Sequence, residues 1–370
     1  MLKKLILIII LLNAFSGREL YAQPTNDAPL RLAVAGTTHG HVGWILGRKD
    51  KKDIQLVGIY EPNKELVQKQ IKQYGIPAEL FYDDLNKMLD NIKPEAVVAF
   101  GSIFQHLAVV EACAPKGIHV MVEKPLAVSV QHAERMQALA RQHGILLLTN
   151  YETSWYPTTE KTYQLAVDSN YVGKIRKAVF HHGHEGPKEI GVSKEFFEWL
   201  TDPVQNGGGA LIDFGCYGSN IITYLMRGEK PVSVTAITSQ FKPSIYPKVD
   251  DEATIIVEYK TAQCIIQASW NWPYGRKDLE LYGDQGYIIA PDRYNLRRRN
   301  KKTSVEWAEK LTQIESGVID DPFVYFAGVI RKKITVPEYS LYSLSNNMMV
   351  VRILDAARES AKTGKKVLLK

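Results

Sequence analysis

The chain has 370 residues, of which 45% are hydrophobic and 10% aromatic, enough apolar material for two domains with buried cores. Its 46 Lys and Arg residues exceed its 40 Asp and Glu residues by a formal net charge of +6. This excess is too small to indicate a nucleic-acid partner. Cys113, Cys216 and Cys264 each lie in an apolar helix or strand pattern, so we expect buried hydrophobic residues rather than disulfides or a metal site.

Residues 1–22 have the pattern of a secretory signal peptide. Lys3 and Lys4 precede an apolar run, Leu5–Leu12, and a small residue, Ala22, stands at the expected cleavage position. The apolar run is shorter than the roughly 20 residues of a membrane span, so we expect no stable membrane insertion. The pattern predicts export to a bacterial periplasm, and the alternative is an uncleaved N-terminal anchor.

Residues 28–149 are expected to form an α/β domain with a doubly wound parallel sheet, the Rossmann fold, because strand and helix patterns alternate along this stretch. The expected strands are Leu30–Gly36, Asp53–Tyr60, Ala96–Phe100, Ile118–Val122 and Ile145–Thr149. The expected helices are Leu66–Tyr74, Asp84–Asn91, Leu107–Ala114 and Ser129–His143.

A degenerate nucleotide-binding turn follows the first strand. Thr38 and His41 stand where the fingerprint has its second and third glycines, so backbone N–H groups at the helix start would bind a pyrophosphate with an added threonine hydroxyl. The His39 side chain could contact the cofactor. Alternatively, it could make only a local hydrogen bond at the start of the helix. The predicted pyrophosphate-binding residues are Gly36, Thr37, Thr38, His39 and Gly40.

Glu61 stands at the end of the second strand, before the turn at Pro62-Asn63. A carboxylate there can accept both ribose hydroxyls and repels a 2′-phosphate, which favours NAD over NADP. A surface glutamate before a turn is the alternative.

The stretch Val120-Met-Val-Glu-Lys-Pro125 closes a buried strand, and Pro125 ends it, so Glu123 and Lys124 lie at the edge where open parallel sheets bind ligands. This Glu-Lys-Pro tripeptide, about ninety residues after the glycine turn, resembles the glucose-fructose oxidoreductase, inositol dehydrogenase and MocA (Gfo/Idh/MocA) family of nicotinamide-dependent sugar oxidoreductases. The resemblance implies that Glu123, Lys124 and the loop residues Ser102 and His106 contact the cofactor. His106 matches the family loop, whereas Ser102 departs from it.

Residues 150–370 are expected to form a second, α+β domain. Strand patterns joined by short turns predict a large open, mostly antiparallel sheet, and the family's sheet commonly forms a subunit interface, so we expect a dimer or tetramer. The basic run at residues 297–302 is predicted to be a solvated loop. The expected strands are Lys174–His182, Val232–Gln240, Ala253–Tyr259, Gln263–Asn271, Lys277–Tyr282 and Gly286–Ala290, with helices Gly209–Met226 and Ser345–Lys362.

The helix after Gly207-Gly-Gly209 carries Asp213, Tyr217 and Asn220 at i, i+4 and i+7, on one predicted face. In most of the family a histidine acts as the acid/base at the position of Tyr217. The resemblance is here to the glucose-fructose oxidoreductase branch, which has a tyrosine at this position. A tyrosine with a pKa of about 10 is a poor base, so we expect the Lys124 ammonium to hydrogen-bond its oxygen and favour the phenolate, with Asp213 orienting Lys124 or a sugar hydroxyl. A buried polar network joining the domains is the alternative.

Aromatic and basic residues are candidates for the substrate cleft. Trp155 and Tyr156 could stack on a sugar or pack between domains. His182 and His184 have no third ligand at a fixed spacing, so no metal is predicted. The predicted substrate-binding residues are Trp155, His184, Lys188, Asn220 and Arg276.

Together these features predict an exported NAD-dependent oxidoreductase that moves hydride between nicotinamide and a secondary alcohol of a sugar or polyol. Because a periplasm has no soluble nicotinamide pool, we expect a tightly held cofactor and a redox-neutral cycle. One alternative is an NAD-dependent glycoside hydrolase that works by transient C3 oxidation and elimination. Another is a non-catalytic sugar-binding module on the same fold.

Overall fold

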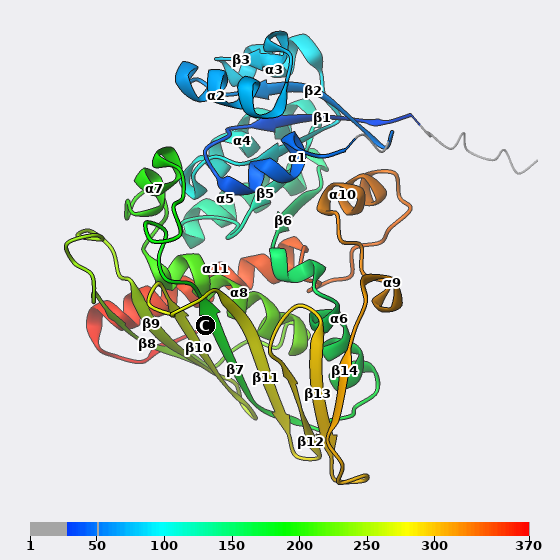
Figure 1. The fold of residues 1–370 in the computed structure, drawn as a ribbon, viewed down its shortest axis with the longest axis vertical. Coiled ribbons are helices and arrows are strands. Elements are labelled where there is room, and N and C mark those ends of the chain that lie inside the picture. The colour runs from blue at the N-terminus through cyan, green and yellow to red at the C-terminus, as the bar shows by residue number, and fades with distance from the viewer. Residues whose placement is uncertain (1–27, 50–51, 370) are drawn as a thin grey trace, which may run out of the picture.

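The first domain is built on a six-stranded parallel sheet with the order β3-β2-β1-β4-β5-β6 (Figure 1). This computed structural model describes residues 28–49 and 52–369, so the expected signal peptide lies outside the described residues. Helices cover both faces of the sheet, which explains why its central strands are continuous apolar runs. The strands are β1 (Leu30–Ala35), β2 (Ile54–Tyr60), β3 (Phe81–Tyr82), β4 (Ala96–Ala99), β5 (His119–Glu123) and β6 (Leu147–Asn150).

The connecting helices begin and end at residues that satisfy free backbone groups. Asn63 accepts hydrogen bonds from two N–H groups at the start of α2, Ser129 does the same once for α5, and Gly144 ends α5 in the left-handed conformation. The helices are η1 (Gly40–Val42), α1 (Gly43–Leu46), α2 (Lys64–Tyr74), α3 (Leu85–Ile92), α4 (His106–Cys113) and α5 (Val130–His143). The predicted Rossmann fold is confirmed.

The second domain contains a nine-stranded sheet with the order β14-β13-β12-β11-β7-β10-β9-β8-β15. Among the described strands of this second sheet, only the β7–β10 pair is parallel, so the predicted mostly antiparallel sheet is confirmed. Its strands are β7 (Ile175–Gly183), β8 (Ser233–Ser239), β9 (Glu252–Glu258), β10 (Gln263–Ser269), β11 (Arg276–Gly283), β12 (Gly286–Ala290), β13 (Asn295–Asn300), β14 (Trp307–Lys310) and β15 (Val367–Leu368).

Two long helices, α8 (Ala210–Leu225) and α11 (Leu344–Thr363), lie between the nine-stranded sheet and the first domain (Figure 1). Asp355 of α11 accepts the Val130 N–H at the start of α5 at 2.7 Å, and Arg358 donates to the Gly207 carbonyl just before α8 at 2.7 Å. The C-terminal helix therefore fastens the two domains to each other.

Helix α10 (Pro322–Ile330) also packs on the first domain, although the sequence placed it in the second. Asp321 at its start forms an ion pair with Arg48 at 2.8 Å, and Arg331 at its end pairs with Glu95 at 2.5 Å. The smaller helices of the second part of the chain are α6 (Pro157–Tyr163), η6 (Gln164–Asp168), α7 (Lys194–Leu200) and α9 (Gln313–Ser316).

The predicted loop is wrong for residues 297–300, which lie in β13 and pair with β12 and β14. Lys301 and Lys302 lie in the turn that follows, and most of the run is exposed to solvent, as predicted. Arg298 contacts Glu309 across the strands at 3.1 Å, and Arg297 contacts Glu306 at 3.5 Å. Carboxylates on the adjacent strand offset the repulsion that a run of arginines would otherwise create.

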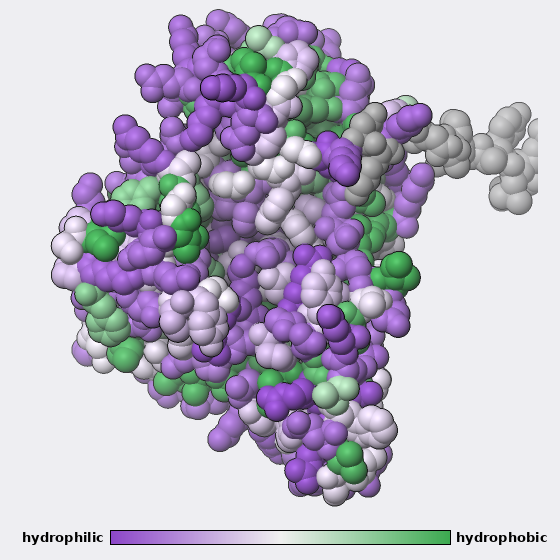
Figure 2. Space-filling view, in the orientation of Figure 1, coloured by the Kyte–Doolittle hydropathy of each residue, from purple (hydrophilic) through white to green (hydrophobic). Residues whose placement is uncertain are grey.

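The three cysteines are free and buried, as predicted. No helix in the described part of the chain is long and apolar enough to cross a membrane. Figure 2 shows a face dominated by polar and charged side chains, with apolar residues in small separate areas.

Candidate active site

A buried ion pair between the domains forms the centre of the site. Lys124 follows the end of β5, and its Nζ lies 2.5 Å from Asp213 Oδ1 and 3.1 Å from the Asp213 carbonyl oxygen on α8. The two side chains are only 7% and 6% exposed. The sequence analysis offered Lys124 or a sugar hydroxyl as the partner of Asp213, and the structure brings Asp213 together with Lys124.

The start of α8 is fixed by Asp250, whose carboxylate accepts the N–H groups of Gly209 and Leu211 at 2.9 and 2.7 Å. A Cβ at Gly209 would lie 1.8 Å from the Asp250 carbonyl oxygen, so only glycine permits this close approach. Asp213 then lies one turn into the helix, where Trp270 Nε1 donates to its Oδ2 at 3.0 Å. These contacts orient its other oxygen toward Lys124.

The pair is ionised at neutral pH. Burial alone would lower the pKa of Lys124, but attraction to Asp213 outweighs it and leaves that pKa raised. Burial likewise opposes ionisation of Asp213, but Lys124 leaves the pKa of this carboxyl lowered. The site therefore holds a permanent ammonium group beside the strand end.

Tyr217 lies one helical turn beyond Asp213 and is 2% exposed. Lys124 Nζ lies 5.0 Å from the centroid of its ring, and the hydrogen bonds of Nζ in the described structure go to Asp213 instead of the phenol oxygen. Burial, with Glu152 next, raises the pKa of Tyr217 well above its ordinary value. The expected phenolate is therefore corrected: Tyr217 is a neutral phenol, able to donate a proton.

A second ammonium group flanks Tyr217, and the sequence analysis missed it. Lys277 of β11 has its Nζ 5.3 Å from the centroid of the Tyr217 ring and 2.6 Å from Glu152 Oε2. Burial opposes ionisation of Glu152, but Lys277 and further partners lower its pKa to about 2. Lys277 faces α8 because it pairs across the strands with His182, and only the strand register reveals this face.

The nucleotide-binding turn borders a cavity of about 280 Å³ between the ends of β1, β2 and β4. Gly36 has φ +78°, and a Cβ there would lie 2.9 Å from Gly101. Glu61 is 4% exposed, and its Oε2 accepts the Thr37 N–H and hydroxyl at 2.9 and 2.7 Å. Thr38 also lines this cavity. This tight turn, backed by a buried carboxylate, fits the adenosine and pyrophosphate parts of NAD.

The loop before α4 contributes to the same cavity. His106 lines it and is fully buried, with Nδ1 3.1 Å from the Leu126 carbonyl oxygen and Nε2 without a partner among the described residues. Ser102 instead donates to Gln205 Oε1 of the second domain at 2.7 Å. His106 is thus placed where a bound nucleotide could satisfy its free nitrogen, and Ser102 joins the domains.

His39 and Glu123 meet directly beside the ion pair, together with His41. His41 Nδ1 lies 3.0 Å from Glu123 Oε2, and His39 Nδ1 accepts the His41 N–H at 3.0 Å. The exposed Gly40 lies between the two histidines. The turn is thereby linked to the strand end that carries Lys124.

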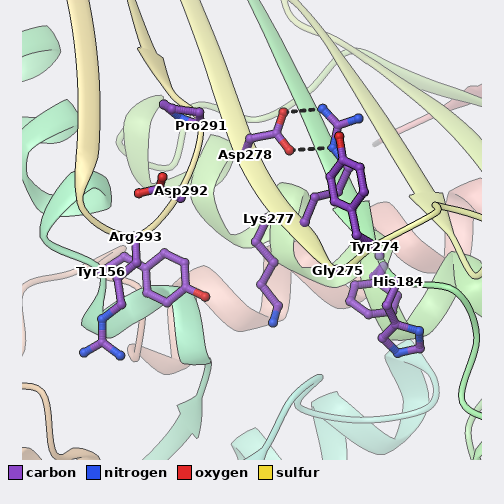
Figure 3. Close-up of a pocket in the computed structure, with 12 residues that line it drawn as sticks. Tyr156, His184, Tyr274, Gly275, Lys277, Asp278, Pro291, Asp292 and Arg293 are labelled. Carbon is purple, nitrogen blue, oxygen red and sulfur yellow. Dashed lines mark hydrogen bonds and ion pairs between the residues drawn. The ribbon is translucent and has the colours of Figure 1, made fainter. Parts of the chain in front are cut away.

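A larger cavity of about 470 Å³ opens on the second-domain side of the site. Figure 3 shows Lys277 extending its ammonium group between Tyr156 and His184. Arg276, which also lines the cavity, is paired with Asp278. Arg276 donates to that carboxylate at 2.7 and 2.6 Å. Of the predicted substrate residues, His184 and Arg276 line this cavity. Its wall combines aromatic side chains with charged ones of both signs, which suits a ligand that has apolar faces and several oxygens.

Three predicted substrate residues lie elsewhere. Asn220 donates to the Leu341 carbonyl at 2.9 Å and is fully buried against α11, because seven residues displace it about 10 Å along the helix from Asp213. Lys188 is exposed and is not among the residues that line the cavity. Trp155 is buried, with its ring centroid 4.6 Å from that of Trp44 of the first domain. It therefore packs between the domains, which was the alternative to stacking on a sugar.

The fold and site define a class: a two-domain oxidoreductase in which a Rossmann domain presents a nicotinamide nucleotide to a cleft roofed by a second domain. Residues 30–151 match the model of the oxidoreductase family with an NAD-binding Rossmann fold, and residues 161–289 match the model of the GFO/IDH/MocA C-terminal domain. The chain belongs to the GFO/IDH/MocA family of oxidoreductases.

Known proteins similar to the chain cover most of its length. Trans-1,2-dihydrobenzene-1,2-diol dehydrogenase of Xenopus tropicalis is 25% identical over 316 residues, which are 82% of this chain and 89% of that protein. An aldose-aldose oxidoreductase from Caulobacter crescentus, solved with glycerol, has a TM-score of 0.74 and 22% identity over 92% of this chain and all of its own. An inositol dehydrogenase homologue from Azotobacter vinelandii, solved with NAD+, has a TM-score of 0.78 and 17% identity over 92% of this chain and 97% of its own.

Proposed function

We propose that this protein is an exported, NAD-dependent oxidoreductase that interconverts a secondary alcohol and a carbonyl on a sugar or polyol. The observation that carries the proposal is the buried Lys124–Asp213 pair beside the neutral phenol of Tyr217. The family's relatives named for a diol, an aldose and an inositol support the substrate class.

NAD would be held along the turn at Gly36 and beside Glu61 and His106, and when bound it supplies the site that accepts or donates a hydride. Glu61 is placed to accept the ribose hydroxyls after its hydrogen bonds to Thr37 are exchanged. A buried carboxylate at this position disfavours a 2′-phosphate, which is the reason we propose NAD over NADP.

The chain's own residues handle the proton. In the direction of carbonyl reduction, the Tyr217 phenol donates its proton to the substrate oxygen, and the Lys124 and Lys277 ammonium groups stabilise the resulting phenolate by charge. In the direction of alcohol oxidation the proton returns to the phenolate. Asp213 does not exchange the proton in this scheme, because it keeps Lys124 charged and in position.

His184 and Lys277 would bind substrate hydroxyls in the larger cavity. His184 Nδ1 accepts the Gly186 N–H at 2.9 Å, which leaves Nε2 to donate toward a ligand, since a neutral imidazole carries one proton. Burial lowers the pKa of His184, so this neutral donor form prevails at neutral pH.

The test begins with the purified protein, which is denatured so that any released nucleotide can be identified by mass spectrometry. Turnover of aldoses and polyols is then followed by nucleotide absorbance, with Tyr217→Phe as the matched control. Bound NAD(H), and turnover that depends on Tyr217, would support the proposal. Release of an aglycone from aryl glycosides without net NADH would favour the glycoside hydrolase, and failure to bind nucleotide would refute both and leave the sugar-binding module.

Export is a separate part of the proposal and rests on the lysine-flanked apolar run at residues 1–22. We expect the protein expressed in a bacterium to be recovered from the periplasmic fraction with Gln23 as its first residue. A cytoplasmic protein that keeps its N-terminus would contradict this part, without bearing on the chemistry. Export would also require that the nucleotide be retained through successive turnovers.

A further inference from the structure

Three potential metal ligands converge where the nucleotide-binding turn meets the end of β5. His39, His41 and Glu123 each offer one ligand atom, and these atoms lie within 4.8 Å of one another. His41 Nδ1 and Glu123 Oε2 are 3.0 Å apart. Two neighbouring ligands with bonds of about 2.1 Å to one metal ion are separated by about 3 Å, so this spacing already suits a shared ion.

Neighbouring side chains hold the three ligands in place. Asn150 donates to the other oxygen of Glu123 at 2.7 Å. The His41 ring stacks on Trp44 with a centroid distance of 3.6 Å, and the His39 ring packs on Phe196 at 4.5 Å. Supporting contacts of this kind orient the ligands of metal sites.

We propose that His39, His41 and Glu123 form a binding site for one divalent transition-metal ion. Two imidazoles and one carboxylate select zinc, iron or manganese over calcium, and three protein ligands leave coordination positions open. Glu123 immediately precedes Lys124, so an oxygen of a ligand bound to this ion would lie beside the reaction centre. Among the described residues, His182 and His184 of the strand do not belong to such a group of three ligands.

The test measures metal binding by the whole purified protein, independently of its activity. Chelator-treated protein is titrated with Co²⁺ as a spectroscopic probe, and the bound metal is counted by elemental analysis. We expect one Co²⁺ per chain, displaced by Zn²⁺. His41→Gln and Glu123→Gln should lose the site, whereas His143→Gln, at the far end of α5, should bind like the parent.

Asn150→Ala keeps all three ligands and should weaken binding by about 10- to 100-fold, which is typical when a residue that orients a metal ligand is removed. Circular dichroism of each variant establishes that it is folded. A parent protein that binds no stoichiometric Co²⁺, or ligand variants that bind it as tightly as the parent, would overturn the proposal. None of these experiments measures turnover, so a negative result would overturn the metal site without affecting the proposed oxidoreductase function.

Discussion

Asp213→Asn is expected to leave a buried ammonium group without its counter-charge. Both side chains of the pair are less than one tenth exposed, so solvent does little to screen the lost interaction. Removing one partner of a buried ion pair destabilises a protein by about 3–5 kcal/mol. The Trp270 hydrogen bond can persist to the amide oxygen, so the loss comes mainly from the charge.

A second calculation sets a ceiling on this loss. An unpaired buried lysine can release its proton, at a cost of about 1.4 kcal/mol for each of the roughly 3.4 pH units between pH 7 and its ordinary pKa of about 10.4. The ceiling at pH 7 is therefore about 5 kcal/mol. It agrees with the range for broken buried pairs.

The pH dependence distinguishes this mechanism from a packing defect. In the parent the raised pKa of Lys124 keeps the stabilisation complete below about pH 10, and it is lost only as pH rises through the folded-state value. In the variant the neutral folded lysine binds fewer protons than the unfolded one. Stability of the variant should therefore rise by about 1.4 kcal/mol per pH unit between pH 7 and 10.

Urea unfolding followed by tryptophan fluorescence measures both quantities. The double variant Lys124→Met/Asp213→Asn is the matched control, because it removes the stranded charge and should recover most of the loss without the slope. A loss below about 1 kcal/mol with no pH slope would refute the reasoning, as would a double variant no more stable than the single one.

Four further outcomes are expected. Tyr217→Phe should lower kcat by about 10²- to 10⁴-fold while NAD(H) affinity in a fluorescence titration stays the same; an unchanged kcat would exclude the proposed proton donor. Gly36→Ala should abolish nucleotide binding, because the alanine Cβ would lie 2.9 Å from the neighbouring loop at a φ of +78°. Normal binding would contradict the proposed role of this turn in holding the nucleotide. Glu61→Ser should raise the ratio of kcat/KM with NADP to that with NAD, and an unmoved ratio would count against the ribose contact. The ion pair with Lys277 lowers the pKa of Glu152 to about 2, so the stability that this pair contributes is complete above the unfolded-state pKa of about 4.3 and is lost as pH falls through about 2. In Lys277→Met, the free energy of unfolding measured in urea should therefore fall less steeply with decreasing pH in this range. The same pH dependence in the variant and the parent would show that the pair is not its cause.

Local patterns were sufficient for the Rossmann domain and for the place of Lys124, because a buried strand that ends in a proline puts this residue at the ligand edge of the sheet. The pairing of Lys124 with Asp213 could be expected only from the family resemblance, since the two residues lie far apart in the sequence. Helix α10 could not be placed in the same way, since its docking on the first domain depends on long-range ion pairs with Arg48 and Glu95.

Two further predictions were wrong because the sequence does not show how far, or in which direction, a side chain lies from the site. Asn220 has the helical spacing of a residue on the same face as Asp213, but the rise along the helix axis places it outside the cleft. Arg276 and Lys277 are adjacent in the sequence, and only the pairing of β11 with β7 shows that Lys277 is the one that faces Tyr217. The neutral state of Tyr217 depends on burial from both domains, which no local pattern contains.

The position of α11 also affects how the protein matures. This helix is made after every strand and helix that carries Lys124, Asp213 or Tyr217, yet Arg358 and Asp355 tie the start of α8 to the start of α5. A nascent chain that still lacks residues 344–363 thus has the reactive side chains and their direct contacts, but not the two hydrogen bonds through which α11 joins the start of α8 to the start of α5. The protein would complete this fastening of its two domains only after its last helix has been made and has docked.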